Sequence, residues 1–157
     1  MAAAAESAVT IEAVYRQEAD KLWRALYAFA ADAEIASDAV SESFAQAIRR
    51  GSAIRDPRAW VWKSGFRIAS GELKRRSTSV HLIPDSSYFD PDVDTELLEA
   101  LAKLPDRQRA AVVLHYYADA PVREIARRTG MSQISVRANL SRGRKRLKLL
   151  LGGDRHG

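Results

Sequence analysis

Apolar side chains recur every three or four residues through most of the chain, and alternation of the strand type does not occur in these segments. This spacing predicts amphipathic helices over residues 10–31 and 33–50, with Gly51 as the stop of the second. A further helix is expected over residues 57–76, because Asp56 can cap it and proline suits the first helical position. The side chains expected to face inward on the first two helices are Ile11, Val14, Tyr15, Leu22, Leu26, Phe29, Ala36, Val40, Phe44, Ala47 and Ile48.

The second half of the chain also carries helical spacing, in four shorter segments. Four leucines between residues 97 and 104 lie on one side of a short helix that Pro105 would end. Three more helices are expected over residues 106–117, 122–130 and 132–150.

Between these halves lies "STSVHLIPDSSYFDPDVD", residues 77–94, which contains two prolines and four aspartates. Such a composition favours an extended linker over a packed element. We therefore predict an all-α protein of two small helical domains, residues 1–76 and 96–157, joined by an acidic flexible linker at 77–95.

The last two predicted helices carry the pattern of a helix-turn-helix, in which the second helix lies in the major groove of DNA. That geometry needs a small residue where the helices touch, a turn residue that tolerates positive φ, and an apolar anchor on the second helix. Ala126, Gly130 and Val136 supply these three features, and Ser132 can cap the second helix. The alternative is an ordinary helical hairpin with a glycine stop.

The distribution of charge favours DNA over that alternative. The 157 residues carry a formal charge of +5, but residues 96–157 alone hold 13 basic and six acidic side chains. Residues 132–150 hold six basic side chains and no acidic one, including Arg144 and Lys148, a like-charged pair one turn apart. Such pairs repel each other unless a polyanion neutralises them. An anionic membrane surface is less favoured, because the apolar side of this helix lacks Trp and Phe.

What the sequence lacks disfavours several classes of function. There is no cysteine and the three histidines are scattered, so we expect no metal site, no cofactor and no catalytic constellation. No apolar stretch is long enough to span a bilayer, and the N-terminal "MAAAAESAV" lacks the basic start of a secretory signal. The expectation is a non-enzymatic cytoplasmic protein without membrane insertion.

The third predicted helix places aromatic side chains among cations. Trp60, Trp62 and Phe66 lie within seven residues of one another, close to Lys63 and Arg67. Aromatic rings beside cations suit stacking on unpaired bases. Packing against the first two helices is the other interpretation, and for any single ring it is the favoured one.

Three segments together resemble a bacterial RNA polymerase sigma factor of the extracytoplasmic-function (ECF) type. "LEALAKLPDRQRAAVVLHYYADAPVREIARRTGMS" is similar to the family's leucine helix, "LP" and "RQR" motifs, apolar run, "EIA" and glycine turn. "ASDAVSESF" is similar to the acidic segment that docks on the polymerase clamp, and "AWVWKSGFRIASGELKRR" to the helix facing the minus-ten element. The resemblance covers about residues 10–151 and implies that the two predicted domains correspond to sigma regions two and four.

The resemblance also implies partners and a role for individual positions. The partners would be core RNA polymerase, promoter DNA and an anti-sigma factor. Side chains that contact or support the polymerase interface would be Asp38, Ser41, Glu42 and Phe44. Those near the minus-ten element would be Trp60, Trp62, Lys63, Arg67, Lys74 and Arg75. Those facing the minus-thirty-five element would be Arg137, Asn139, Ser141, Arg142, Arg144, Lys145 and Lys148.

Several positions depart from the family pattern and leave two other interpretations open. Ser41 stands where the family usually has Gln, and Ile134 replaces the Gly before the recognition helix. Arg67 and Gly71 replace the Asn and Asp of region two. One alternative is a sigma-like protein whose promoter melting is altered or lost. The other is a helix-turn-helix regulator that acts without docking on polymerase, in which the N-terminal domain mediates dimerisation or binds an effector.

Overall fold

The computed structural model describes residues 2–78 and 94–152 of the chain. These residues form seven α-helices and one 3-10 turn, and they contain no β-strand. The helices are α1 (Ala2–Ala30), α2 (Ala33–Arg50), α3 (Pro57–Thr78), α4 (Thr95–Ala102), α5 (Asp106–Tyr117), α6 (Val122–Thr129) and α7 (Gln133–Gly152), and the turn is η1 (Gly51–Ala53). The predicted all-α fold class is confirmed.

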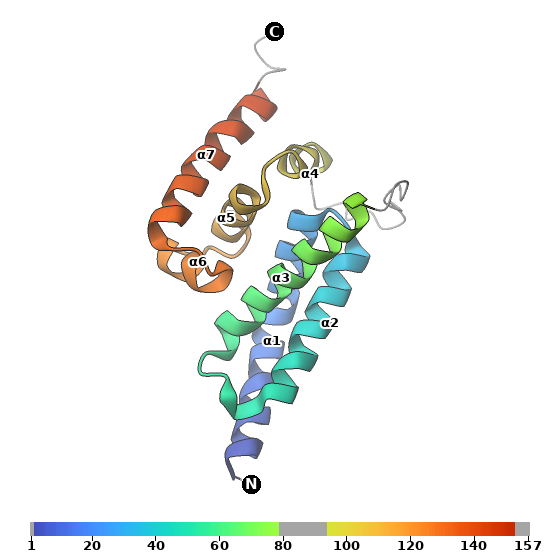
Figure 1. Ribbon diagram of the computed structural model, residues 1–157, viewed down its shortest axis with the longest axis vertical. Coiled ribbons are helices and arrows are strands. Elements are labelled where there is room, and N and C mark those ends of the chain that lie inside the picture. Colours follow the sequence, from blue (N-terminus) through green and yellow to red (C-terminus); the bar gives the residue numbers. More distant parts are fainter. Residues whose placement is uncertain (1, 79–93, 153–157) are drawn as a thin grey trace.

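Helices α1, α2 and α3 run up, down and up in a three-helix bundle (Figure 1). Their apolar sides meet in a shared core, in which Leu22, Leu26, Ile35 and Val61 are at most 2% exposed. Burying one such side chain stabilises the fold by about 1.5–3 kcal/mol. The bundle therefore depends on the spacing of apolar residues that is visible in the sequence.

Short polar contacts set the ends of α2 and α3. Asp32 Oδ1 accepts a hydrogen bond from the Ile35 N–H at 3.0 Å, and Gly51, with φ of 55°, ends α2 as predicted. Asp56 Oδ1 accepts from the Ala59 N–H at 3.2 Å, which confirms the predicted cap of α3. Both caps satisfy amide groups that the first turn of a helix leaves without an internal partner.

The last four helices contribute the remaining side chains of one continuous buried cluster. The side chains at most 1% exposed in this group include Leu101, Val113, Leu114, Ile125 and Val136. These residues come from all four helices, so α4 to α7 form one packed unit.

The two groups of helices are packed against each other. Helix α6 lies against α3, and both α4 and α5 lie against α1 (Figure 1). Helix α7 lies on the side of its group that faces away from the bundle. One side of α6 is therefore covered by α3, whereas the outer side of α7 faces solvent.

Two inward-facing predictions are wrong. Tyr15 and Ile48 are 52% and 66% exposed. A three-helix bundle covers only a narrow stripe of each helix, and Ile48 is turned about 100° around α2 from the buried Ala47. Tyr15 stays at the edge of the core, where its ring packs edge-on against Phe44 with the centroids 5.0 Å apart.

The helix bounds differ slightly from the predicted ones. Helix α1 begins at Ala2, earlier than expected, and α3 continues to Thr78. The predicted linker, residues 77–95, therefore overlaps the end of α3 and the first residue of α4. Its central part, residues 79–93, lies outside the described residues.

Gly143 allows α7 to lie directly against α5. A Cβ atom built at this position would lie 2.7 Å from Val112 Cγ2 and 3.3 Å from the Gln108 carbonyl oxygen. Val112 is only 2% exposed, so its methyl group has little room to move. The close contact between these helices requires a residue without a side chain.

We expect Gly143→Ala to lower the free energy of unfolding by about 1–2 kcal/mol, because the added methyl group overpacks the contact. Gly71→Ala is the matched control, since a Cβ atom there would meet nothing within 4 Å. That variant should raise the free energy of unfolding by up to about 1 kcal/mol through helix propensity. Urea denaturation measures both changes, and stabilisation by both substitutions would contradict the close crossing.

Candidate nucleic-acid interface

The turn between α6 and α7 is held in one conformation by its own polar contacts. Gly130 adopts the left-handed conformation, with φ of 79°, and its N–H donates to the Ala126 carbonyl oxygen at 2.9 Å. Thr129 Oγ1 donates to the Ile125 carbonyl oxygen at 2.7 Å and accepts from the Met131 N–H at 3.2 Å. The predicted turn is therefore present, at a backbone angle that favours glycine.

The second helix starts and packs as predicted. Ser132 Oγ accepts a hydrogen bond from the Ser135 N–H at 3.1 Å and caps the helix. Val136 is fully buried, and Leu140 and Leu147 are buried on the same side. This packing turns the opposite side of α7 toward solvent.

The solvent-facing side of α7 presents the cations and contains no acidic residue. The exposed members of the predicted minus-thirty-five set are Arg137, Ser141, Arg142, Arg144, Lys145 and Lys148. Four of these, Arg137, Ser141, Arg144 and Lys145, help to line a hollow of about 440 Å³ beside Val122 at the start of α6. An unopposed cluster of cations along one helix attracts phosphate and raises the rate at which a polyanion is encountered.

Asn139 differs from the other members of this set. It is half-buried, and its Nδ2 donates to the Ser135 carbonyl oxygen at 2.9 Å and to Ser135 Oγ at 3.2 Å. Its amide nitrogen is thus engaged within the helix, unlike the exposed cations around it.

Two residues at the end of α5 contact the cationic side of α7, and the sequence analysis missed both. His115 Nε2 lies 2.6 Å from Arg144 Nη2. The Arg144 guanidinium also lies 5.6 Å from the ring centroid of Tyr116, which is 57% exposed. His115 must accept this hydrogen bond, because a guanidinium has no acceptor. The three consecutive ring side chains in "HYY", at the end of α5, could have indicated this contact from the sequence.

The predicted minus-ten set lies along α3. Lys63, Arg67, Lys74 and Arg75 are exposed, and Trp60 is half-buried. The Arg50 guanidinium lies 5.6 Å from the Trp60 ring centroid. A hollow of about 280 Å³ beside this ring is lined by four cations, Arg50, Arg55, Lys63 and Arg127. The last of these comes from α6, so both groups of helices contribute to the hollow.

Trp62, the other tryptophan of the predicted minus-ten set, is not exposed. Its side chain is fully buried and packs on Phe66, with the ring centroids 6.4 Å apart. The guanidinium of Arg128, from α6, lies 4.6 Å from the Trp62 ring centroid. In this arrangement Trp62 is part of the contact between the two groups of helices and is not open to a base.

Two buried arginines, Arg109 and Arg128, join the two groups of helices, and the sequence analysis did not single them out. Arg109 Nη1 donates to the Phe29 carbonyl oxygen at 2.9 Å, and its guanidinium lies 4.7 Å from the Phe29 ring centroid. Burial lowers the pKa of Arg128, while Glu18 and Glu124 counteract this by favouring the charged form. Each arginine is 9% exposed.

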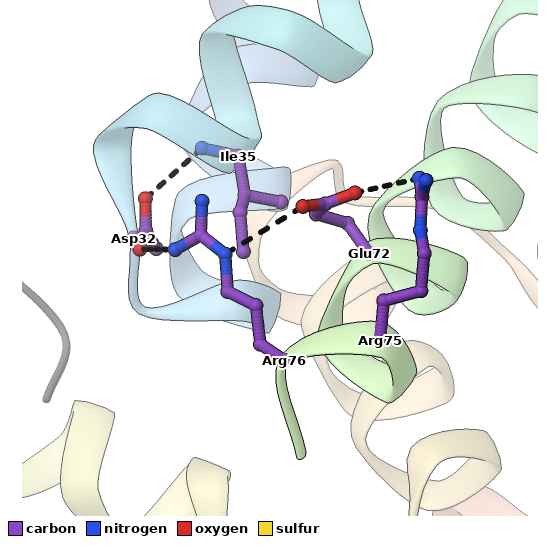
Figure 2. A network of polar contacts seen from close by, with 5 residues as sticks. All are labelled: Asp32, Ile35, Glu72, Arg75 and Arg76. Atoms are coloured by element: carbon purple, nitrogen blue, oxygen red, sulfur yellow. Dashed lines mark hydrogen bonds and ion pairs between the residues drawn. The ribbon is translucent and has the colours of Figure 1, made fainter. Parts of the chain in front are cut away.

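A network of charges connects the basic end of α3 to the start of α2 (Figure 2). Asp32 Oδ2 pairs with Arg76 Nη1 at 2.5 Å while its other oxygen caps α2. Glu72 pairs with two arginines. Its Oε1 lies 3.6 Å from Arg76 Nε, and its Oε2 lies 2.6 Å from Arg75 Nη2. Arg75, a member of the predicted minus-ten set, is therefore ion-paired although it is exposed.

The predicted docking residues lie on α2. Asp38, Ser41 and Glu42 are exposed, whereas Phe44 is 5% exposed and belongs to the core. Hydrogen bonds from Gln46, at 3.0 Å, and Arg49, at 3.1 Å, lower the pKa of Glu42. Glu42 thus keeps its negative charge at neutral pH, while Phe44 fixes the helix beneath it.

Residues 2–78 and 94–152 contain no group of three or more His, Cys, Asp or Glu side chains that could hold a metal ion. In the same part of the chain, no helix is both long and apolar enough to cross a membrane.

Comparison with known proteins places the helix-turn-helix in a family. Residues 94–147 match the family model of sigma-70 region 4. The RNA polymerase sigma factor SigV of Bacillus subtilis is 27% identical over 139 residues, which cover 82% of this chain and 83% of SigV. The ECF RNA polymerase sigma factor SigL of Mycobacterium tuberculosis is 29% identical over 167 aligned residues, covering 96% of this chain and 93% of SigL.

Solved structures share the arrangement of helices. The sigma factor RpoE of Bartonella quintana, solved with the anti-sigma factor NepR, has a TM-score of 0.72 and 18% identity over 88% of this chain and 94% of RpoE. CnrH, solved with the cytosolic domain of CnrY, has a TM-score of 0.72 and 21% identity over 97% of this chain and 94% of CnrH.

The fold joins a three-helix bundle to a helix-turn-helix whose second helix has a cationic, solvent-facing side, and the helix-turn-helix lies within the match to sigma-70 region 4. The chain is similar to ECF sigma factors over both groups of helices, and residues 94–147 match sigma-70 region 4. Sigma factors are non-enzymatic, which agrees with the prediction from the sequence.

We expect Asp32→Ala to lower the free energy of unfolding by about 1–2 kcal/mol, because the helix cap and the ion pair to Arg76 are lost together. Asp32→Asn keeps the cap and removes the charge, so it should lower the free energy of unfolding by less than Asp32→Ala does. Glu34→Ala removes a neighbouring exposed acid as a control and should change the stability by at most about 0.5 kcal/mol. Chemical denaturation tests all three variants, and equal losses for Asp32→Ala and Glu34→Ala would contradict the network.

Proposed function

We propose that this chain binds core RNA polymerase in the cytoplasm and directs promoter-specific initiation of transcription. The similarity to ECF sigma factors supports a role in polymerase-associated transcription initiation in general. The more specific proposal of promoter binding rests on the cationic side of α7, which is exposed and contains no acidic residue. The turn at Gly130 directly precedes this helix. A helix of this charge after such a turn suits the major groove of DNA.

In this proposal the two groups of helices have separate tasks. Residues 1–76 dock on the polymerase and face the minus-ten element, and residues 96–157 read the minus-thirty-five element. The acidic segment 77–95 joins them. The match to sigma-70 region 4, which begins at residue 94 and is confined to the second group, supports this division.

For the minus-thirty-five element, Arg137, Ser141 and Arg142 are the proposed base readers, and Arg144, Lys145 and Lys148 contact phosphates. Exposure on one side of α7 supports the assignment. Arginine can donate two hydrogen bonds to the major-groove edge of guanine, which is worth about 1–3 kcal/mol of discrimination. Asn139 has a smaller role, because its amide nitrogen already bonds within the helix.

For the minus-ten element, the proposed contacts are Trp60 and the exposed cations Lys63, Arg67, Lys74 and Arg75. The hollow beside Trp60 combines an aromatic ring with cations, which suits an unpaired nucleotide. Trp62 can contribute only when Arg128 moves away from its ring.

For polymerase docking, Asp38, Ser41 and Glu42 form the proposed contact surface, and Phe44 supports it from the core. We also propose an anti-sigma factor as a partner. RpoE was solved with the anti-sigma factor NepR, and CnrH with the cytosolic domain of CnrY.

The proposal is tested by mixing the full chain with purified bacterial core RNA polymerase and a pool of random-sequence duplex DNA. We expect a stable complex with the core enzyme, enrichment of a two-part sequence and run-off transcripts from it. Enrichment of a two-fold symmetric sequence by the chain alone, without a core complex, would favour a regulator that does not dock on polymerase. A complex with core polymerase and DNA that yields no transcripts would favour a sigma-like protein whose promoter melting is lost.

Arg137→Ala and Lys148→Ala separate base reading from phosphate contact. Arg137→Ala should weaken discrimination between the selected minus-thirty-five sequence and its single-base variants by about 1–3 kcal/mol. Lys148→Ala should weaken binding to all sequences alike and reduce the slope of log affinity against log salt by about 1. Fluorescence anisotropy over a salt series measures both effects. If Arg137→Ala discriminated between these sequences as well as the native chain does, the base-reading role of Arg137 would be refuted.

Glu42→Lys is expected to lower the affinity for core polymerase by at least about tenfold, because it reverses a charge on the proposed docking surface. Glu12→Lys is the matched control, since Glu12 is also exposed and also paired with an arginine, on α1. Biolayer interferometry with immobilised core enzyme provides the measurement. Equal losses for the two variants would indicate a general charge effect and contradict the assigned surface.

A further inference from the structure

We propose that Ile134 selects a thymine in the minus-thirty-five element, by packing against the C5-methyl group of that base in the major groove. The inference rests on the proposed function, because it concerns the sequence that α7 reads. It goes further by naming a specificity-determining residue outside the predicted minus-thirty-five set and the chemical group that it recognises. In the sequence, Ile134 replaces the glycine that the family usually has before the recognition helix.

Ile134 is an apolar side chain that the fold leaves in water. It is the second residue of α7 and is 79% exposed. Burial would stabilise an isoleucine, and a β-branched side chain is a weaker helix former than most straight-chain ones. Neither the core nor the helix therefore benefits from an isoleucine at this position. Single exposed apolar side chains are common on proteins, so the place of Ile134 on α7 is what assigns it a role.

Ile134 lies opposite the buried side of α7. Successive residues of an α-helix are turned by about 100° around its axis. By this count the buried residues of α7 are turned about 180–240° from Ile134, and they are Val136, Leu140, Gly143 and Leu147. The exposed Ser141 and Lys145 are turned from it by only about 20°. Ile134 therefore continues the cationic, solvent-facing side of α7 into the first turn of the helix.

The first turn of α7 is the part of the helix that suits contact with bases. In a helix-turn-helix, the N-terminal residues of the second helix contact base edges in the major groove. Helix α7 begins directly after the cap at Ser132, and its first turn contains no acidic residue that would repel phosphates. In the proposed complex Ile134 therefore lies at the end of α7 that approaches the base pairs, on the side that faces them.

The chemistry of the side chain indicates which base it contacts. Isoleucine has no group that donates or accepts a hydrogen bond, and the C5-methyl group of thymine is the apolar group that a base pair presents in the major groove. Contact between the two removes apolar surface of both from water, which is favourable. A polar base edge against Ile134 would instead lose its water without gaining a partner. Ile134 thus favours thymine over cytosine, the other pyrimidine.

The spacing from Arg137 indicates where in the element the thymine lies. Arg137 follows Ile134 by three residues, which corresponds to about 4.5 Å along the helix axis. Neighbouring base pairs are separated by about 3.4 Å along the DNA. The contacted thymine should therefore lie within about two base pairs of the pair whose recognition is lost in Arg137→Ala.

Replacement of thymine by deoxyuridine tests the contact directly, because it removes the methyl group and keeps the base pairing. The element is first selected from the random-sequence pool with the full native chain and core polymerase. Each of its thymines is then replaced in turn, and the affinity of the complex is measured by fluorescence anisotropy. We expect one replacement, close to the base pair read by Arg137, to weaken binding about fourfold, as the loss of one buried methyl group does.

Variants of the chain assign the effect to Ile134. Ile134→Ala should bind the thymine and deoxyuridine forms of that position equally well, whereas Ile134→Val keeps the branched methyl groups and should retain most of the discrimination. Leu149→Ala is the control, because it truncates another exposed aliphatic side chain, 75% exposed, near the other end of α7. It should discriminate as the native chain does. Since Ile134 is exposed, Ile134→Ala should leave the urea midpoint almost unchanged, which separates base contact from a structural role.

The role of Ile134 is overturned if no deoxyuridine replacement weakens binding, or if Ile134→Ala keeps the native discrimination. A selected element without thymine near the base pair read by Arg137 would also overturn it. Failure of the proposed function looks different, because then no complex with core polymerase and no transcripts form. If the chain alone selects a sequence in that case, the same replacements in that sequence decide the role of Ile134. If no sequence is selected, both proposals are refuted.

Discussion

The guanidinium of Arg128 lies over the buried ring of Trp62, at the contact through which α6 packs on α3. An arginine side chain stays charged in proteins, so its burial requires partners that favour the charge. The indole ring and two nearby carboxylates are such partners, and they place α6 on α3. The rigid turn at Gly130 then fixes the direction of α7. The burial of Val136, Leu140 and Leu147 leaves the cationic side of α7 facing solvent.

Arginine serves two purposes in this chain, and burial separates them. Arg109 and Arg128 are buried against aromatic rings and carry contacts between helices. Arg137 and Arg142 are exposed on a helix without acids, where their charge has no internal partner on the same helix. The charge of the chain is therefore a poor guide to the proposed DNA-binding surface until the burial of each cation is known.

Local chemistry explains what could be predicted from the sequence. Helix bounds, the caps at Asp56 and Ser132 and the left-handed turn at Gly130 depend on residues a few positions apart. The family resemblance rested on the same local motifs. The placement of α6 on α3 could not be predicted in this way, because it joins residues more than 60 positions apart in the sequence. Trp62 is the clearest case, since packing was the favoured interpretation of each ring but the contact with Arg128 of α6 was not predicted.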